Sequence, residues 1–116
     1  MSQLKQINAL ALRLRLQGET YIRFGKYNEA LIDFNKLLGL EPNNYLALRL
    51  RGETYLNLKK FNEALTDFNQ LLEIQPNNRV LHNEIIEKYN QILEIEPNNA
   101  LALRLQGETY QNFKKI

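Results

Sequence analysis

Residues 45–78, YLALRLRGETYLNLKKFNEALTDFNQLLEIQPNN, decide the fold of this chain. Shifting the sequence by 34 residues places a closely similar pattern of small, aromatic and proline residues on top of them. The aligned pairs are Gly18 with Gly52, Tyr21 with Tyr55, Ala30 with Ala64, Phe34 with Phe68 and Pro42 with Pro76. A repeat of this length is typical of proteins in which each unit packs on the next along one axis.

Apolar residues recur at helical spacing in six segments of the sequence. The predicted helices span residues 9–24, 28–40, 45–58, 62–74, 79–95 and 100–114. Gly25 offers the left-handed conformation that ends a helix, and the sequence Pro-Asn-Asn at Pro42, Pro76 and Pro97 stops the helix before it. Because the connections are short, neighbouring helices are expected to run antiparallel in an all-α fold.

The repeat is incomplete after residue 78. Residues 82–99, HNEIIEKYNQILEIEPNN, match the second helix of the unit and its stop, so the sequence of a first helix is deleted there. We call helices first-type or second-type by their sequence, and their order is first, second, first, second, second, first. One domain, 1–116, is expected, with full repeats at 11–44 and 45–78, a shortened unit at 79–99 and a terminal helix at 100–116.

The sequence leaves two arrangements of the last two helices open. Residues 79–95 can take the place of a third first helix, with residues 100–114 packed as its second helix in a closed stack. Alternatively, the last helix projects from the stack and contacts another subunit.

Six residues at fixed spacing resemble the signature of the tetratricopeptide repeat, W-x2-L-G-x2-Y, A-x3-F and P over 34 residues. They are Leu48, Gly52, Tyr55, Ala64, Phe68 and Pro76. The chain departs from the signature with Leu48 at the tryptophan and with Gln17, Arg51 and Gln106 at the leucine before the glycine. The resemblance implies a right-handed α-solenoid of antiparallel helix pairs. It also implies a non-catalytic module that binds a peptide or helix of another protein in its concave groove.

Composition and charge exclude several other classes of function. The formal charge is +2, from 15 Lys and Arg against 13 Asp and Glu, so nucleic acid is not an expected partner. No apolar run is long enough to span a bilayer, and the chain start lacks a signal peptide, so an intracellular, cytoplasmic protein is expected. Cysteine is absent and His82 is the single histidine, so we expect a packing role for His82 and no metal, cofactor or enzymatic activity.

Three arginine–glutamate pairs occur four residues apart on first-type helices: Arg15 with Glu19, Arg49 with Glu53 and Arg104 with Glu108. Stacking of the units would align such pairs along one wall of the groove. They can form a ladder of intramolecular salt bridges between adjacent first helices or contact a bound peptide, and the sequence does not separate the two. The predicted groove residues are Arg15, Glu19, Ile22, Arg23, Arg49, Glu53, Leu56 and Asn57.

Some chaperone-binding members of the family hold a C-terminal carboxylate with lysine or arginine followed four residues later by asparagine. Here Glu19 and Glu53 occupy the asparagine positions after Arg15 and Arg49. Because a glutamate repels a carboxylate and neutralises the arginine, we predict no carboxylate clamp and a ligand of mixed or basic charge.

Self-assembly is the alternative function, because a solenoid end exposes apolar surface unless a polar helix covers it. In this reading the chain dimerises through its uncapped C-terminal helices. The residues predicted for such a contact are Arg104, Gly107, Glu108 and Phe113.

Overall fold

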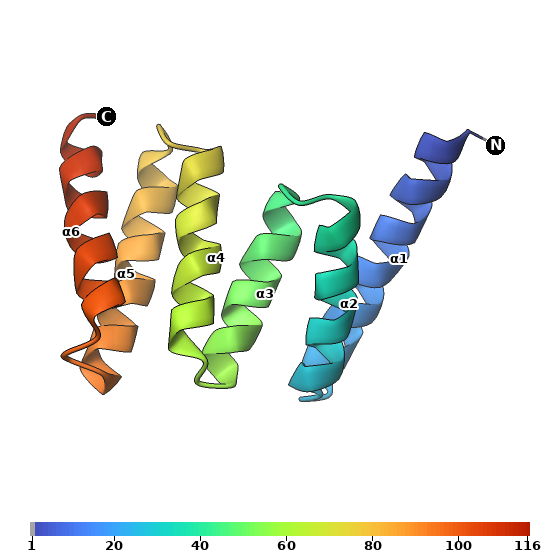
Figure 1. Ribbon diagram of the computed structural model, residues 1–116, viewed down its shortest axis with the longest axis horizontal. Coiled ribbons are helices and arrows are strands. Elements are labelled where there is room, and N and C mark those ends of the chain that lie inside the picture. Colours follow the sequence, from blue (N-terminus) through green and yellow to red (C-terminus); the bar gives the residue numbers. More distant parts are fainter. Residues whose placement is uncertain (1) are drawn as a thin grey trace.

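The computed structural model describes residues 2–116, which form six α-helices and no strand (Figure 1). The helices are α1 (Gln3–Arg23), α2 (Tyr27–Leu40), α3 (Tyr45–Asn57), α4 (Phe61–Ile74), α5 (Arg79–Ile95) and α6 (Ala100–Lys114). They stand side by side in an elongated stack of 47 × 31 × 19 Å, with α1 at one end and α6 at the other. Within residues 2–116, no helix combines the length and the apolar character needed to cross a membrane.

The helix boundaries agree with the sequence prediction to within one residue, except at the start of α1. This helix begins at Gln3, six residues earlier than predicted, and the Ser2 hydroxyl caps it by accepting a hydrogen bond from the Lys5 amide at 3.2 Å. The first residues of α1 are mostly polar and exposed. Leu4 and Ile7 are their apolar residues and Leu4 is exposed, so the segment gives only a weak helical pattern.

The Pro-Asn-Asn stops build the same cap three times. In each, the side-chain oxygen of the last asparagine accepts a hydrogen bond from the backbone amide three residues later, at 2.9–3.0 Å. Its amide group also donates to the side chain three residues earlier. These asparagines are Asn44, Asn78 and Asn99. The turn therefore ends one helix and starts the next, as the sequence predicted.

Each full hairpin is closed by an aromatic ring that rests on a glycine. A Cβ atom added at Gly52 would lie 2.8 Å from Cε1 of Phe68, and one at Gly18 would lie 2.5 Å from Cε1 of Phe34. The aromatic ring therefore fills the space left by the missing side chain.

The shortened unit closes the stack. Helix α5 packs beside α4, and α6 packs against both α5 and α4, so the last helix does not project (Figure 1). The side-chain amide of Asn99, in the turn before α6, donates to Asn62 Oδ1 of α4 at 3.0 Å. The buried face of α6 consists of Ala102, Leu105 and Thr109.

The matched glycines Gly52 and Gly107 give a direct test of this packing. We expect Gly52→Ala to destabilise the protein by about 1–3 kcal/mol, because the new methyl group collides with the Phe68 ring. Gly107→Ala meets nothing within 4 Å, so it should stabilise the helix by about 0.5–1 kcal/mol through helix propensity. Urea denaturation of both variants measures the difference, and equal effects of the same sign would contradict the packing described here.

Candidate functional site

The first-helix face is the surface formed along α1, α3 and α5 by Arg15, Glu19, Arg49, Glu53 and Glu84. Helices α1 and α3 are in contact, whereas α3 and α5 make no close backbone contact. The side chains of Arg49 and Glu84 nevertheless join α3 to α5. Helix α5 therefore takes the place of a third first helix, although its sequence is of the second type.

Arg15 and Glu19, four residues apart on α1, form an ion pair with each other. Arg15 Nη1 lies 3.1 Å from Glu19 Oε1, and each side chain is about one quarter exposed. The corresponding pair on α6, Arg104 and Glu108, also forms, with 3.3 Å between Nη1 and Oε1. It lies far more exposed to solvent, because α6 occupies the place of a second helix at the end of the stack.

Arg49 does not pair with Glu53, the glutamate four residues after it on α3. The guanidinium of Arg49 instead forms two hydrogen bonds with Glu84, one of them from Nη2 to Oε2 at 3.0 Å. The same Nη2 donates to the Tyr45 hydroxyl at 3.0 Å, and the guanidinium lies over the Tyr45 ring at 5.5 Å from its centroid. The Glu84 carboxylate on α5 accepts hydrogen bonds from both Nη atoms of Arg49. This two-point geometry is better than a glutamate on the same helix offers.

This ion pair holds both partners in their charged forms. The hydrogen bond from Arg49 lowers the pKa of the Glu84 carboxyl below its ordinary value, against a smaller opposing effect of burial. In turn, Glu84 raises the pKa of Arg49. Glu84 was not among the residues predicted for the groove. The sequence around Glu84 does not indicate a place in the groove, because this residue follows a deletion that moves α5 beside the first helices.

The remaining predicted groove residues differ in accessibility. Ile22, Glu53 and Leu56 are half-buried, while Arg23 and Asn57 are exposed. Leu56 packs against the apolar core, and the Asn57 side-chain amide donates to the Glu53 carbonyl of its own helix at 3.0 Å. The structure thus gives Leu56 a packing role, whereas Arg23 offers its charge to solvent.

The residues predicted for self-association differ in how accessible they are. Phe113 is half-buried beneath the guanidinium of Arg79, 4.5 Å from its ring centroid, so it is engaged within the chain. Gly107 is open, and Leu103 and Tyr110 beside it on α6 are 49% and 44% exposed. The counterparts of these residues on α3 face α4, with Leu48 and Gly52 buried. The face of α6 that meets a second helix in the full repeats is therefore uncovered.

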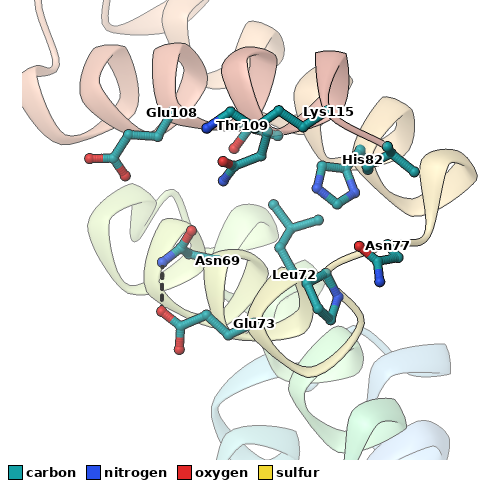
Figure 2. A pocket seen from close by; sticks show the side chains of 11 residues that line it. Asn69, Leu72, Glu73, Asn77, His82, Glu108, Thr109 and Lys115 are labelled. Carbon is teal, nitrogen blue, oxygen red and sulfur yellow. Dashed lines mark hydrogen bonds between the residues drawn. The ribbon is translucent and has the colours of Figure 1, made fainter.

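A polar cleft of about 420 Å³ lies between α4 and α6, on the side of the second helices. Figure 2 shows Asn69, Leu72 and Glu73 of α4 opposite Glu108 and Thr109 of α6, with His82 of α5 at one end. Asn69 Nδ2 donates to Glu73 Oε1 at 3.4 Å. The sequence did not predict this cleft, because it depends on α6 packing beside α4.

His82 has the packing role that was predicted for it. The imidazole is almost fully buried, and its Nδ1 lies 2.8 Å from the Asn78 carbonyl oxygen, to which it donates. In the neutral ring Nε2 is then an acceptor at the end of the cleft (Figure 2). Among residues 2–116 there is no group of three His, Cys, Asp or Glu side chains that could hold a metal ion.

Comparison with known proteins identifies the repeat. Two family models, both described as tetratricopeptide repeat, match residues 16–44 and 45–78, which together make up more than half of the chain. A search of curated proteins found no match.

Four solved structures of similar fold are described as tetratricopeptide repeat domains. The first domain of Spaghetti (RPAP3), bound to the HSP90 peptide SRMEEVD, is 28% identical with a TM-score of 0.58, and the match covers 87% of this chain and 90% of that one. The first domain of human RPAP3 is 27% identical with a TM-score of 0.58, covering 91% and 94%. The second human RPAP3 domain, in complex with the HSP70 peptide SGPTIEEVD, is 20% identical over 90% and 98% with a TM-score of 0.60, and supports the fold alone.

The ion pair between Arg49 and Glu84 predicts a small, pH-dependent contribution to stability. A lowered folded-state pKa means that the pair stabilises above the ordinary carboxyl value of 4.5 and that this gain is lost as the pH falls through the lowered value. Glu84→Gln should therefore cost about 0.5–1 kcal/mol at neutral pH, reduced by partial solvent exposure, and nothing in strong acid.

Thermal melts of the wild type and of Glu84→Gln as a function of pH measure this difference. Glu87→Gln is the matched control, since Glu87 is exposed on the same helix. A difference between the wild type and Glu84→Gln that persists unchanged in strong acid would contradict the assigned pair.

Proposed function

Because this chain belongs to the tetratricopeptide repeat family, we propose that it is a non-catalytic interaction module that binds a peptide or helix of another protein on the first-helix face. The observation that carries the proposal is the row of half-exposed charged groups on this face. Arg15, Glu19, Arg49 and Glu84 each keep between about 24% and 36% of the side chain accessible. They can therefore exchange an internal partner for a ligand without leaving a buried charge unpaired.

The charges on this face favour a ligand of mixed or basic character. Arg15 is paired with Glu19, and Arg49 with Glu84, so neither arginine is free to receive a carboxylate. Glu53 adds a further acid that has no arginine partner within residues 2–116. The similar Spaghetti domain binds a peptide that ends in EEVD. We propose that the present chain does not bind such acidic C-termini and that its partner supplies basic side chains, in a cytoplasmic setting.

Selection from a random peptide library displayed on phage, with the full chain as bait, tests this function. We expect enriched peptides that combine apolar with basic residues. The double variant Arg49→Glu and Glu84→Arg keeps an ion pair but exchanges its charges, so it should weaken the selected peptides about tenfold. Glu94→Lys, at an exposed position in the last turn of α5, is the control and should leave binding unchanged. If the enriched peptides bind the double variant as tightly as the wild type, they do not bind on the proposed face.

The peptide SRMEEVD serves as a second probe in the same assay. The wild type should not bind it, whereas replacing Glu19 and Glu53 by Asn and Glu84 by Gln should release both arginines and allow binding. Tight binding of SRMEEVD to the wild type would contradict the charge argument.

We also propose that α6 supports self-association through its uncovered face. Leu103 and Tyr110 flank the open Gly107, and a second copy can approach closely at a glycine. In a two-fold arrangement Arg104 of one copy meets Glu108 of the other, so the exposed pair on α6 can exchange partners.

Sedimentation equilibrium across micromolar concentrations measures this association. Gly107→Lys should abolish the dimer, because a long charged side chain then occupies the contact. Gly39→Lys is the matched control, since Gly39 is also an exposed helical glycine with nothing within 4 Å. A wild type that stays monomeric at every concentration would rule out this second function.

A further inference from the structure

The corresponding aspartates of the two full units, Asp33 and Asp67, differ in their hydrogen-bond partners. In the second unit Asp67 of α4 is 2% exposed and accepts two hydrogen bonds from Arg51, at 2.8 Å from Nε and 2.7 Å from Nη2. Arg51 also donates from Nη1 to Asn35 Oδ1 of α2 at 3.0 Å. A single arginine on α3 therefore satisfies the buried carboxylate of its own unit and contacts the preceding second helix.

In the first unit the corresponding carboxylate has no such partner. Asp33 lies 34 residues before Asp67 and is 8% exposed, yet its Oδ2 is buried without a hydrogen-bond partner among residues 2–116. Gln17 stands at the position of Arg51. Burial raises the pKa of the Asp33 carboxyl, and Lys36 lowers it to a smaller extent. An unpaired buried carboxylate is costly, so a cation that reached it would gain binding free energy.

Asp33 lines a cavity at the α1 end of the stack. The cavity measures about 560 Å³, and its other lining residues are Leu10, Arg13, Leu14, Gln17, Lys36 and Leu40. A second depression of about 540 Å³ shares Arg13 and Gln17 and continues along α1 past Leu12, Leu16 and Thr20. Leu12 and Leu16 are each about half exposed. We call these two connected depressions the α1 end face.

The other two first-type helices show what covers the equivalent surface. On α3, Arg51 is bonded to Asn35 of the preceding second-type helix, and on α6 the equivalent Gln106 is bonded to Asn90 of α5. The neighbouring threonines, Thr54 and Thr109, are buried there, whereas Thr20 of α1 is exposed. A second-type helix therefore fits this surface twice within the molecule, and on α1 the same surface is open.

We propose that the α1 end face binds an amphipathic helix of a partner protein whose apolar side covers Leu12 and Leu16 and whose arginine or lysine reaches Asp33. The basic residue stands where Asn35 and Asn90 stand in the internal contacts. Because Gln17 is shorter than Arg51, it leaves room for a long side chain to pass. The second-type helices of this chain carry asparagine at that position, Asn35, Asn69 and Asn90, so a second copy does not supply the cation. This inference concerns a surface apart from the first-helix face.

Two synthetic peptides test the proposal against the full-length chain. One carries the α2 sequence, residues 27–40, with arginine in place of Asn35, and the matched peptide keeps the asparagine. We expect the arginine peptide to bind at least about tenfold more tightly, and amide and methyl shifts in NMR to map to Leu12, Leu16 and Thr20. Equal affinities, no binding of either peptide, or shifts confined to α6 would overturn the proposal.

Two variants of the protein locate the cation. Asp33→Asn should remove the preference for the arginine peptide while keeping the fold, which circular dichroism verifies. Gln17→Arg places a guanidinium beside Asp33 as Arg51 lies beside Asp67, so it should block the arginine peptide. If the preference survives in Asp33→Asn, the cation binds elsewhere and the proposal fails.

The stability of Gln17→Arg provides an independent readout. The raised pKa of Asp33 means that its unpaired charge costs nothing below the ordinary value of 3.8 and that the cost grows as the pH rises through the raised value. Gln17→Arg should therefore raise the melting temperature at neutral pH and lose that gain in acid. No gain at neutral pH would show that Arg13 or Lys36 already neutralises Asp33, and would overturn the proposal.

Discussion

The seating of an aromatic ring on a helical glycine determines the geometry of the two full units. At Gly52 the Phe68 ring fills the volume that a side chain would occupy, and this fixes how closely and at what height α3 meets α4. Arg51 and Asp67 are the sequence neighbours of these two residues. The same contact therefore brings the guanidinium to the buried carboxylate, and from there to Asn35 of the preceding unit. The close approach of the Phe68 ring to Gly52 therefore determines both the packing within the unit and its polar contact with the preceding unit.

In the shortened unit, α6 keeps the contact that a first-type helix makes with the second-type helix before it. The contact within a unit, in which an aromatic ring rests on a glycine, is lost. Helices α5 and α6 are joined by the same asparagine-capped turn as α2 and α3, and the bond from Gln106 to Asn90 repeats the one from Arg51 to Asn35. Tyr89, the counterpart of Phe68, has no glycine of its own first helix. It is buried without a hydrogen-bond partner for its hydroxyl among residues 2–116, and burial raises its pKa. Gly107 is left open at the end of the stack, because no helix among residues 2–116 packs on that face of α6.

The sequence was sufficient for features that depend on local pattern. Helical periodicity and the asparagine caps located five of the six helices to within one residue, and Gly25 adopts the left-handed conformation, with φ of 72°. Features that depend on which helices become neighbours could not be derived. Arg49 and Glu53 were grouped because they lie four residues apart on one helix, whereas the deletion brings Glu84 within reach of Arg49. The polar cleft at His82 arises from the same rearrangement.

The unpaired Asp33 could have been found from the sequence by comparing the units position by position. Asp33 and Asp67 are the same residue, whereas their partner positions hold Gln17 and Arg51, and such an unmatched substitution indicates a carboxylate without its cation. As a consequence, the two proposed surfaces differ in whether their charged groups already have partners. On the first-helix face the arginines are already neutralised by partly exposed glutamates, so a ligand must compete with existing ion pairs. At the α1 end face Oδ2 of the buried Asp33 accepts no hydrogen bond from residues 2–116, so a cation there competes with no existing hydrogen bond and relieves the cost of a desolvated charge.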